Sequence, residues 1–169
     1  LDRLTKLSQH PFLLDATRRL ELQDPLCYLQ SSPKLKKVVE TLHVIRQQGE
    51  KAIIFTRSRP MQDILKLVFE HEFKLAVGVI NGSPISGRRY IVKDRTNRIK
   101  DFESLPGFNV LILSPDVAGV GLTITAANHV IHYGRWWNPA REAQATDRVY
   151  RIGQERDVHV YLPIERDPR

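Results

Sequence analysis

Five short apolar runs alternate with helical patterns from residue 51 onward, and this alternation limits the possible folds more than any other feature. The runs cover residues 52–55, 75–80, 109–114, 129–133 and 158–162. Each is nearly continuous in apolar residues, as expected of strands that are buried on both faces. Strands that alternate with helices form a mainly parallel sheet with helices on both sides. We therefore predict a three-layer α/β domain.

Helix start and stop signals support this order. One helix should begin at Ser32-Pro33 and stop at Gly49, and another should begin at Pro60. A third should end near Leu105–Gly107 and a fourth should begin at Asn138-Pro139. Residues 1–32 are less regular, with a break at Gln23–Pro25, and we expect them to form a helical lead-in to the domain at 33–169. Ligands of such sheets bind in the loops after the strands.

Composition excludes several classes of protein. Of 169 residues, 41% are hydrophobic and 27% are charged, as in a soluble globular domain. The single cysteine, Cys27, allows neither an intramolecular disulfide nor a cysteine-based zinc site. The longest apolar runs fall far short of the ~18 residues that span a membrane, and the first residues do not resemble a signal peptide. We expect an intracellular domain without a bound metal of its own and without a membrane partner.

The net charge of +7 is concentrated in one segment. Residues 88–100 contain six basic residues and one acidic residue, which accounts for +5 of the total. A concentrated basic patch is typical of a surface that follows phosphates. A solvated helix face that happens to be rich in arginine explains the same pattern equally well.

The loop from Gly82 to Gly87 has the glycine spacing of a phosphate-binding loop. In that loop, a lysine and then a serine or threonine contact the phosphates and magnesium. Here Arg88 and Arg89 stand at those positions, and Pro84 removes one backbone donor. We therefore predict that this chain lacks a complete nucleotide site and does not hydrolyse a nucleotide by itself.

Three polar residues share one face of the helix that begins at Asn138-Pro139. Gln144, Arg148 and Arg151 stand at positions i, i+4 and i+7. Two parallel guanidinium groups match the oxygens of a phosphate. Salt bridges from the arginines to Asp147 or Glu155 are the alternative, and spacing alone does not separate the two.

A glycine-containing turn follows the strand at 109–114. Gly119 and Gly121 would let the backbone approach a ligand closely, and Thr123 and Thr125 carry hydroxyl groups that can bind it. A tight turn into a buried helix is an equally good explanation. Farther on, Trp136 and Trp137 are adjacent, so at least one is expected to face a groove or a partner.

Taken together, these segments resemble the second motor lobe of the Snf-type ATPases, which are superfamily-two DNA translocases. The most specific match is Asp147-Arg148-Val149-Tyr150-Arg151-Ile152-Gly153-Gln154. Upstream matches follow in the family's order and cover nearly the whole chain: Leu4–Leu14 with His10-Pro11, Ser32–Leu35, Ile53–Thr56 with Met61–Leu65, and Asn81–Ser83 with Arg95 and Phe102. The segment Gly134–Pro139 resembles the bacterial members.

The resemblance implies a RecA-like fold and a role for each matching residue. Arg148 and Arg151 match the arginine fingers of motif VI, which reach the γ-phosphate of ATP held by the first lobe, and Gln144 matches the glutamine of that motif. Ser114 and the turn 118–125, with Gly119, Gly121, Thr123 and Thr125, match motif V, which contacts the DNA backbone and couples to the ATP site. Thr56 and Arg57 match motif IV, another contact to the DNA strand. Trp137 matches a tryptophan that stabilises the lobe near the cleft, where simple packing is the alternative.

Two departures from the family pattern stand out. The motif V loop carries Asp116 and Thr123 where the family has arginine and asparagine, so we do not expect Asp116 to contact phosphate. The segment 83–95 is longer than the family's link and contains much of the basic patch. Our hypothesis is that Arg88 and Arg89 in this extension make an added DNA contact.

The resemblance predicts the C-terminal lobe of an ATP-dependent double-stranded-DNA translocase. ATP with Mg²⁺ would be held mainly by an N-terminal RecA-like lobe of the same protein, which this chain lacks. A strand-separating helicase acting on DNA or RNA is one alternative, and a non-catalytic nucleic-acid-binding module is another. The presence of both arginines argues against the second. A bacterial source would place the protein in the cytoplasm with the nucleoid, and a eukaryotic source in the nucleus.

Overall fold

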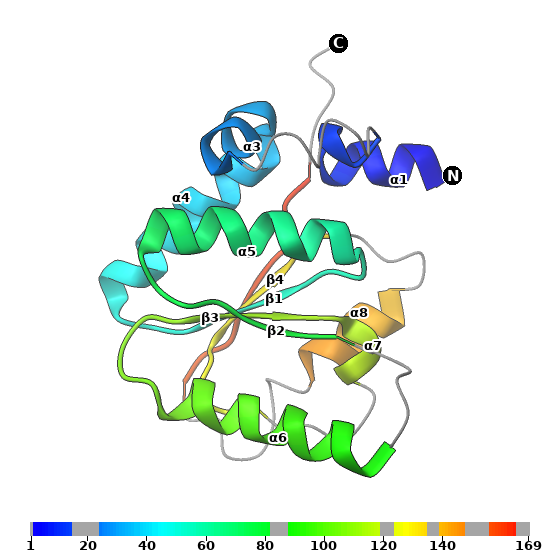
Figure 1. Ribbon diagram of the computed structural model, residues 1–169. Coiled ribbons are helices and arrows are strands. Elements are labelled where there is room, and N and C mark those ends of the chain that lie inside the picture. Colours follow the sequence, from blue (N-terminus) through cyan, green and yellow to red (C-terminus); the bar gives the residue numbers. More distant parts are fainter. Residues whose placement is uncertain are drawn as a thin grey trace.

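The computed structural model describes residues 2–14, 24–81, 88–118, 124–134, 139–147 and 156–164. At residues 2–4, 88–94, 118, 139 and 141 it describes the backbone without the side chain. Figure 1 shows a central sheet with helices on both sides.

All five predicted strands are present, and every pairing between them is parallel. The sheet has the order β2-β3-β1-β4-β5. The strands are β1 (Ala52–Phe55), β2 (Gly78–Ile80), β3 (Val110–Leu113), β4 (His129–His132) and β5 (His159–Tyr161). The predicted parallel sheet is thus confirmed. β2 starts three residues later than the apolar run suggested. The preceding helix ends at Phe73, and its C-cap residue Lys74 has a left-handed backbone (φ 55°).

The helices begin and end close to the predicted positions. They are α4 (Pro33–Gln48), α5 (Arg59–Phe73), α6 (Arg88–Ser104) and α8 (Pro139–Thr146). The short helix α7 (Pro115–Ala118) was not among the predicted helices. The Ser32 and Ser58 side chains cap α4 and α5 by accepting hydrogen bonds from backbone amides in the first turn. Gly49 ends α4 with φ 69°, a conformation that glycine adopts without steric cost.

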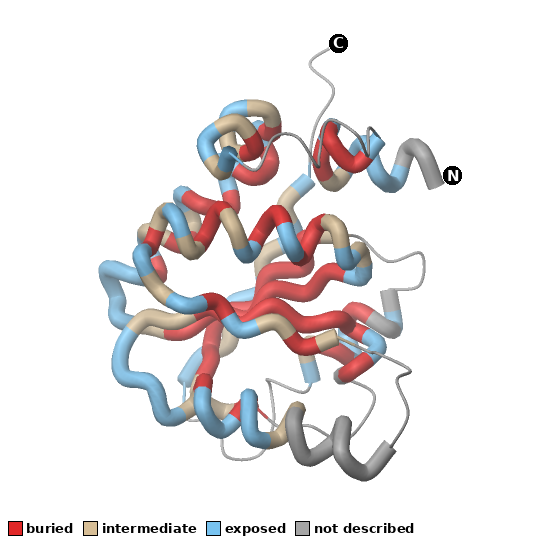
Figure 2. The backbone as a smooth tube through the Cα atoms, in the orientation of Figure 1, coloured by how far each residue is buried: buried red, intermediate tan, exposed pale blue. Residues whose placement is uncertain are grey.

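The helices form two layers because alternate residues of each strand point to opposite faces. On one face, Ile54 and Ile112 pack with Leu35 of α4 and Leu65 of α5. On the other face, Ile53 and Leu111 pack with Phe102 of α6, Val117 of α7 and Ala145 of α8. Every residue of β1 is at most 1% exposed, and Figure 2 shows the buried residues concentrated in the central strands. The predicted three-layer architecture is confirmed.

One prediction about the strands is wrong. We expected all five to be buried on both faces, but His159 and Val160 of β5 are exposed, and so is Gly78 of β2. In the sheet formed by the described residues, β2 and β5 are the edge strands, and β5 pairs there only with β4. Its apolar sequence therefore reflects the packing of Tyr161 and Val158 against the two cores rather than complete burial.

The described residues of the lead-in, 2–14 and 24–32, are mostly helical and pack against the domain. It contains α1 (Asp2–Gln9), the 3₁₀ turn η1 (Pro11–Leu13) and α3 (Pro25–Ser31). Phe12, Leu13 and Tyr28 belong to the same buried cluster as α4 and α5. The separation of residues 1–32 from residues 33–169 as two units stays a prediction. No helix in the described parts of the chain has both the length and the apolar character to cross a membrane.

Candidate functional site

The carboxyl edge of the sheet brings together two of the predicted DNA-contacting segments. The sheet ladder extends one residue past β1 and β3, where the Thr56 amide donates to Leu113 O (3.1 Å) and the Ser114 amide donates to Ile80 O (2.9 Å). After β1 the chain turns to the face covered by α5, whereas after β3 it turns to the face covered by α7. Neighbouring loops that diverge in this way form the crevice where ligands of parallel sheets bind.

Thr56 and Ser114 form the floor of this edge and are nearly inaccessible. Thr56 is 1% exposed and Ser114 is 7% exposed. Gln62, in the first turn of α5, donates from Nε2 to Thr56 O (2.7 Å) and fixes the backbone at the end of β1. Among the described residues, neither Thr56 Oγ1 nor Gln62 Oε1 has a hydrogen-bond partner. Both are buried polar atoms of the kind that usually has a partner in a native structure.

Arg57 and Asp116 form an ion pair across the same edge. Arg57 Nε lies 3.4 Å from Asp116 Oδ2, with both side chains about half exposed. From the sequence we expected Arg57 to contact DNA together with Thr56, and we did not expect Asp116 to belong to the site. Arg57 and Asp116 follow β1 and β3 by two and three residues, and the structure shows that these two strands are parallel neighbours. Opposite charges at such offsets are candidates for an ion pair.

The remaining motif V residues divide between described and undescribed parts of the chain. The Thr125 amide donates to Glu103 Oε1 (3.1 Å), which ties the end of the turn to the last turn of α6. Gly119, Gly121 and Thr123 lie outside the described residues. Their roles therefore stay predictions, as does that of Thr125.

The helix α8 presents Gln144 to solvent. Gln144 is exposed, whereas Glu142 and Ala145 on the opposite side are buried. Near the end of α8, Thr146 Oγ1 donates to Glu142 O (3.1 Å). Arg148 and Arg151 lie outside the described residues, as do Trp136 and Trp137. The predicted shared face of Gln144, Arg148 and Arg151 thus stays a prediction.

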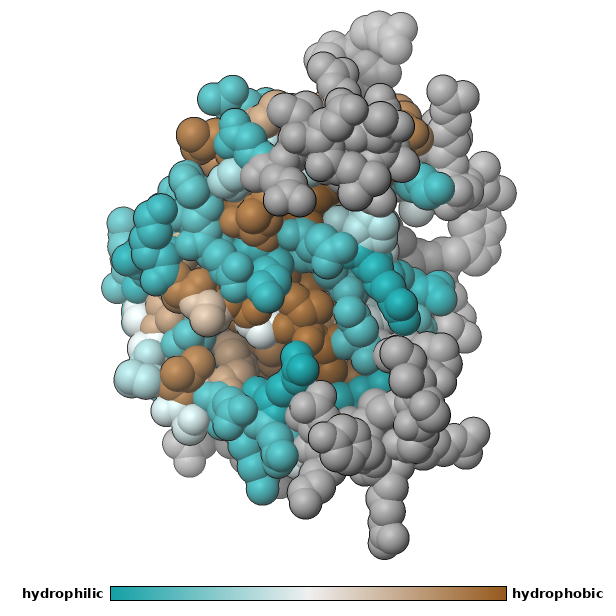
Figure 3. All heavy atoms as spheres, viewed as in Figure 1, coloured by the Kyte–Doolittle hydropathy of each residue, from teal (hydrophilic) through white to brown (hydrophobic). Residues whose placement is uncertain are grey.

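Two arginines of the basic segment 88–100 form hydrogen bonds to backbone carbonyls in and after β2. Arg95 donates to Asn81 O (3.1 Å) and Arg98 donates to Val79 O (3.3 Å). Ile80 O bonds to Ser114 of the neighbouring strand, so these alternate carbonyls point to the free side of β2. Figure 3 shows the face with α5 and α6, where hydrophobic side chains lie between the hydrophilic surfaces of the two helices. The side chains of Arg88 and Arg89 are not described, so their DNA contact stays a hypothesis.

No cluster of three or more His, Cys, Asp or Glu side chains suited to a metal ion occurs within the described part of the chain.

Comparison with known proteins agrees with this architecture. Residues 33–153 match the model of the helicase conserved C-terminal domain. YwqA of Bacillus subtilis, which carries the name of an ATP-dependent helicase/translocase, is 43% identical over 164 residues, or 97% of this chain and 16% of YwqA. The Zorya protein ZorD of Escherichia coli is 39% identical over 99% of this chain and 15% of ZorD. This chain therefore spans about one sixth of the length of these relatives.

Solved structures give the same result. The SWI2/SNF2 ATPase core of Sulfolobus solfataricus in complex with double-stranded DNA superposes with a TM-score of 0.71 at 34% identity, covering 95% of this chain and 30% of that one. The C-terminal part of the Fun30 ATPase domain also gives 0.71, at 28% identity over 80% of this chain and 42% of that one. The chain belongs to the helicase conserved C-terminal domain family, and the solved structures that it resembles are SWI2/SNF2 and Fun30 ATPase domains.

Proposed function

We propose that this lobe grips the backbone of double-stranded DNA with its carboxyl edge and supplies Arg148 and Arg151 to ATP held by an N-terminal lobe. The observation that carries the proposal is the meeting of Arg57 and Ser114 at one edge, on loops that diverge to opposite faces of the sheet. A relative of the same fold bound to double-stranded DNA supports the choice of partner. ATP with Mg²⁺ is the substrate, and the first lobe contributes most of its contacts.

The chemistry assigned to this chain is electrostatic. Negative charge on a phosphoryl group in transfer is stabilised by guanidinium groups, which Arg148 and Arg151 would provide across the interlobe cleft. Contacts to DNA at Arg57, Thr123 and Thr125, and at the added Arg88 and Arg89, would go to backbone phosphates and sugars. Thr56 and Ser114 are nearly inaccessible, so they would act by holding the loops that make these contacts. Such contacts carry little sequence information, so binding would depend strongly on salt. Gln144, Gly119 and Gly121 would couple the ATP site to closure of the lobes.

The function is tested on the full-length protein. We expect ATP hydrolysis that double-stranded DNA stimulates, movement along the duplex in a triplex-displacement assay, and no hydrolysis by the isolated 169-residue chain. Separation of the strands of a forked duplex, or stronger stimulation by RNA, would instead indicate a helicase. DNA binding without any hydrolysis would indicate a non-catalytic module. Turnover by the isolated chain would contradict the proposed dependence on a first lobe.

The Arg57–Asp116 pair gives a prediction for DNA binding. An exposed ion pair contributes at most about 1 kcal/mol, so Arg57 can exchange its carboxylate partner for a phosphate. Asp116→Asn removes the competing charge, and we expect the affinity of the full-length protein for duplex DNA to rise about threefold at moderate salt. The slope of log K against log[salt] should steepen by about one unit. Arg57→Ala should have the opposite effects.

The exposed pair between Lys37 and Glu40 on α4 provides the matched control. Glu40→Gln removes a carboxylate from a similar exposed ion pair on α4, and it should change neither the affinity nor the slope. If Asp116→Asn behaves like Glu40→Gln in fluorescence-anisotropy titrations across a salt series, Arg57 does not contact phosphate.

A further inference from the structure

Strand β4 carries a histidine at each end, and the two side chains hold different parts of the chain. His129 and His132 are three residues apart, so they point to opposite faces of the sheet. His132 stacks on Phe55, with ring centroids 5.3 Å apart, and its Nε2 lies 2.8 Å from Oγ1 of Thr146 at the end of α8. On the other face, His129 contacts Tyr161 of β5 and Glu50, which lies shortly before β1. β4 is thus tied both to α8 and to β5.

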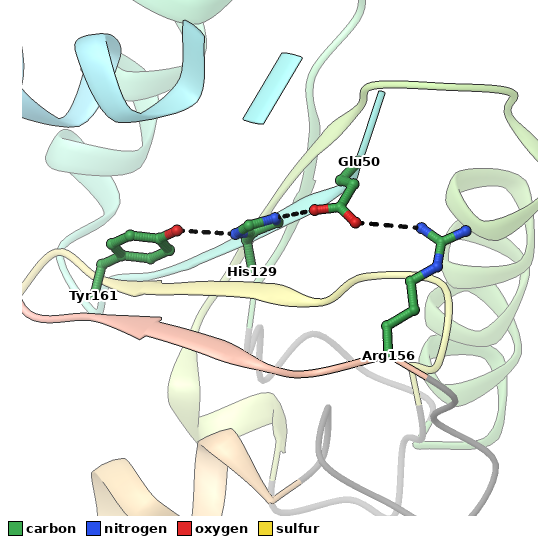
Figure 4. Close-up of polar contacts among 4 residues, drawn as sticks. All are labelled: Glu50, His129, Arg156 and Tyr161. Atoms are coloured by element: carbon green, nitrogen blue, oxygen red, sulfur yellow. Dashed lines mark hydrogen bonds and ion pairs between the residues drawn. The ribbon is translucent and has the colours of Figure 1, made fainter. Parts of the chain in front are cut away.

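A chain of hydrogen bonds runs through His129, which is 2% exposed (Figure 4). Its Nε2 lies 2.5 Å from Glu50 Oε2 and its Nδ1 lies 3.0 Å from the hydroxyl of Tyr161. A neutral imidazole satisfies both contacts, because Nε2–H can donate to the carboxylate while Nδ1 accepts from the tyrosine. The rings of His159 and Tyr161 on β5 stack against His129, at centroid distances of 5.1 and 5.9 Å.

The electrostatics agree with this proton arrangement. Burial lowers the pKa of His129, against the opposing influence of Glu50, and so favours the neutral ring. The hydrogen bond from His129 lowers the pKa of Glu50 and keeps its carboxylate ionised. Burial raises the pKa of Tyr161, which keeps its hydroxyl protonated. Glu50 Oε1 also lies 3.9 Å from Arg156 Nη1, in the residues that lead into β5.

These contacts fix both ends of one connection. At the first end, Thr146 in the last turn of α8 is hydrogen-bonded to His132. At the second end, Arg156 forms an ion pair with Glu50, and Tyr161 of β5 is hydrogen-bonded to His129. Arg148 and Arg151 lie between these two ends in the sequence. The charged pair of this network, Glu50 and Arg156, is partly exposed and 3.9 Å apart, so its ionic contribution to stability is small.

We propose that Glu50, His129 and Tyr161 are positioning residues that set where the segment carrying Arg148 and Arg151 enters β5. The proposal rests on the function proposed above for those two arginines. The network lies at the amino edge of the sheet, since Glu50 precedes β1 and His129 begins β4. It is therefore opposite the edge assigned to DNA and acts on hydrolysis through the geometry of the connection alone. A displacement of about 1 Å at a catalytic group can cost up to a hundredfold in rate.

The test uses steady-state kinetics of the full-length protein with saturating duplex DNA. His129→Gln and Glu50→Gln should each lower kcat about tenfold, while the KM for ATP and the affinity for DNA change less than twofold. Tyr161→Phe removes one hydroxyl and should lower kcat by a smaller factor, about threefold. This variant is isosteric, so it keeps the test valid should His129→Gln fail to fold. Thermal unfolding must show every variant folded at the assay temperature.

A second histidine–glutamate contact supplies the control. His43 Nε2 lies 2.9 Å from Glu72 Oε1, between α4 and α5 and away from the connection to β5. His43→Gln should leave kcat unchanged. Equal losses of kcat in His43→Gln and His129→Gln, or a rise in KM as large as the loss of kcat, would overturn the inference.

Alanine variants of the arginines separate the two proposals. If Arg148→Ala abolishes hydrolysis while His129→Gln, Glu50→Gln and Tyr161→Phe retain full kcat, the positioning role is wrong and the arginine fingers stand. If Arg148→Ala and Arg151→Ala both retain kcat, the proposed function is wrong and the positioning role fails with it.

Discussion

Replacing either Arg148 or Arg151 with alanine in the full-length protein should lower the kcat of DNA-stimulated ATP hydrolysis by a factor of about 10³ or more. Negative charge is spread over the oxygens of the phosphoryl group during transfer, and a guanidinium group stabilises that charge in a cleft from which water is excluded. A thousandfold loss corresponds to about 4 kcal/mol of transition-state stabilisation. The KM for ATP should change little, because the first lobe would make most of the ground-state contacts.

Two further variants sharpen this experiment. Lysine keeps the charge but lacks the planar fork of donors, so Arg148→Lys and Arg151→Lys should recover only a small part of the activity. Arg46, an exposed residue in the last turn of α4, provides the control. Arg46→Ala should leave kcat unchanged. A loss of less than tenfold in both alanine variants would show that neither arginine reaches the transferred phosphoryl group.

Lys51→Met should lower the free energy of unfolding by about 2–3 kcal/mol. Lys51 is 7% exposed, and its ammonium group donates to Phe102 O (2.9 Å) and Glu103 O (2.8 Å). These carbonyls belong to the last turn of α6, where backbone acceptors lack partners within the helix and the helix dipole favours a positive charge. Methionine fills similar space but leaves both carbonyls without this donor. Burial lowers the pKa of Lys51, and the relief of that desolvation offsets part of the loss.

The measurement is urea unfolding of the 169-residue chain at neutral pH, followed by circular dichroism. A loss of this size corresponds to a decrease in Tm of roughly 4–12 °C. Lys66→Met is the control, because Lys66 is exposed on α5 and lies 3.9 Å from Glu70. Its effect should stay below about 1 kcal/mol. Equal stability of the Lys51→Met variant and the original chain would show that solvent satisfies the end of α6 equally well.

Much of the fold could be predicted from local chemistry. Buried strands in a parallel sheet read as continuous apolar runs, and β1 is the clearest example, with all four residues at most 1% exposed. The caps at Ser32 and Gly49 mark both ends of α4 because each satisfies a backbone need that few residue types meet. β5 was misjudged because its run is apolar although it lies at an edge, and position within a sheet is a tertiary property.

The candidate site was predictable only in part. Motif order indicated Thr56, Arg57 and Ser114, and the strand order brings the ends of β1 and β3 together. The contact between Arg57 and Asp116 was missed because it depends on which strands are neighbours. The Glu50–His129–Tyr161 chain was missed for the same reason, since 79 residues separate Glu50 from His129 and 32 separate His129 from Tyr161. Such pairs become visible only when the sheet order is known.

Arg95 and Arg98 protect the edge strand β2 from pairing with a strand of another copy of this lobe. Edge strands expose unpaired carbonyls and amides, which can act as a template for strand addition and aggregation. At β2, the two arginines occupy the outward carbonyls of Val79 and Asn81 and surround them with positive charge. The strand of a second chain could pair with these two carbonyls only by displacing both guanidinium groups. Arg95 and Arg98 belong to the basic segment whose composition suggests phosphate binding, and they also protect the β2 edge of the sheet from the addition of another strand.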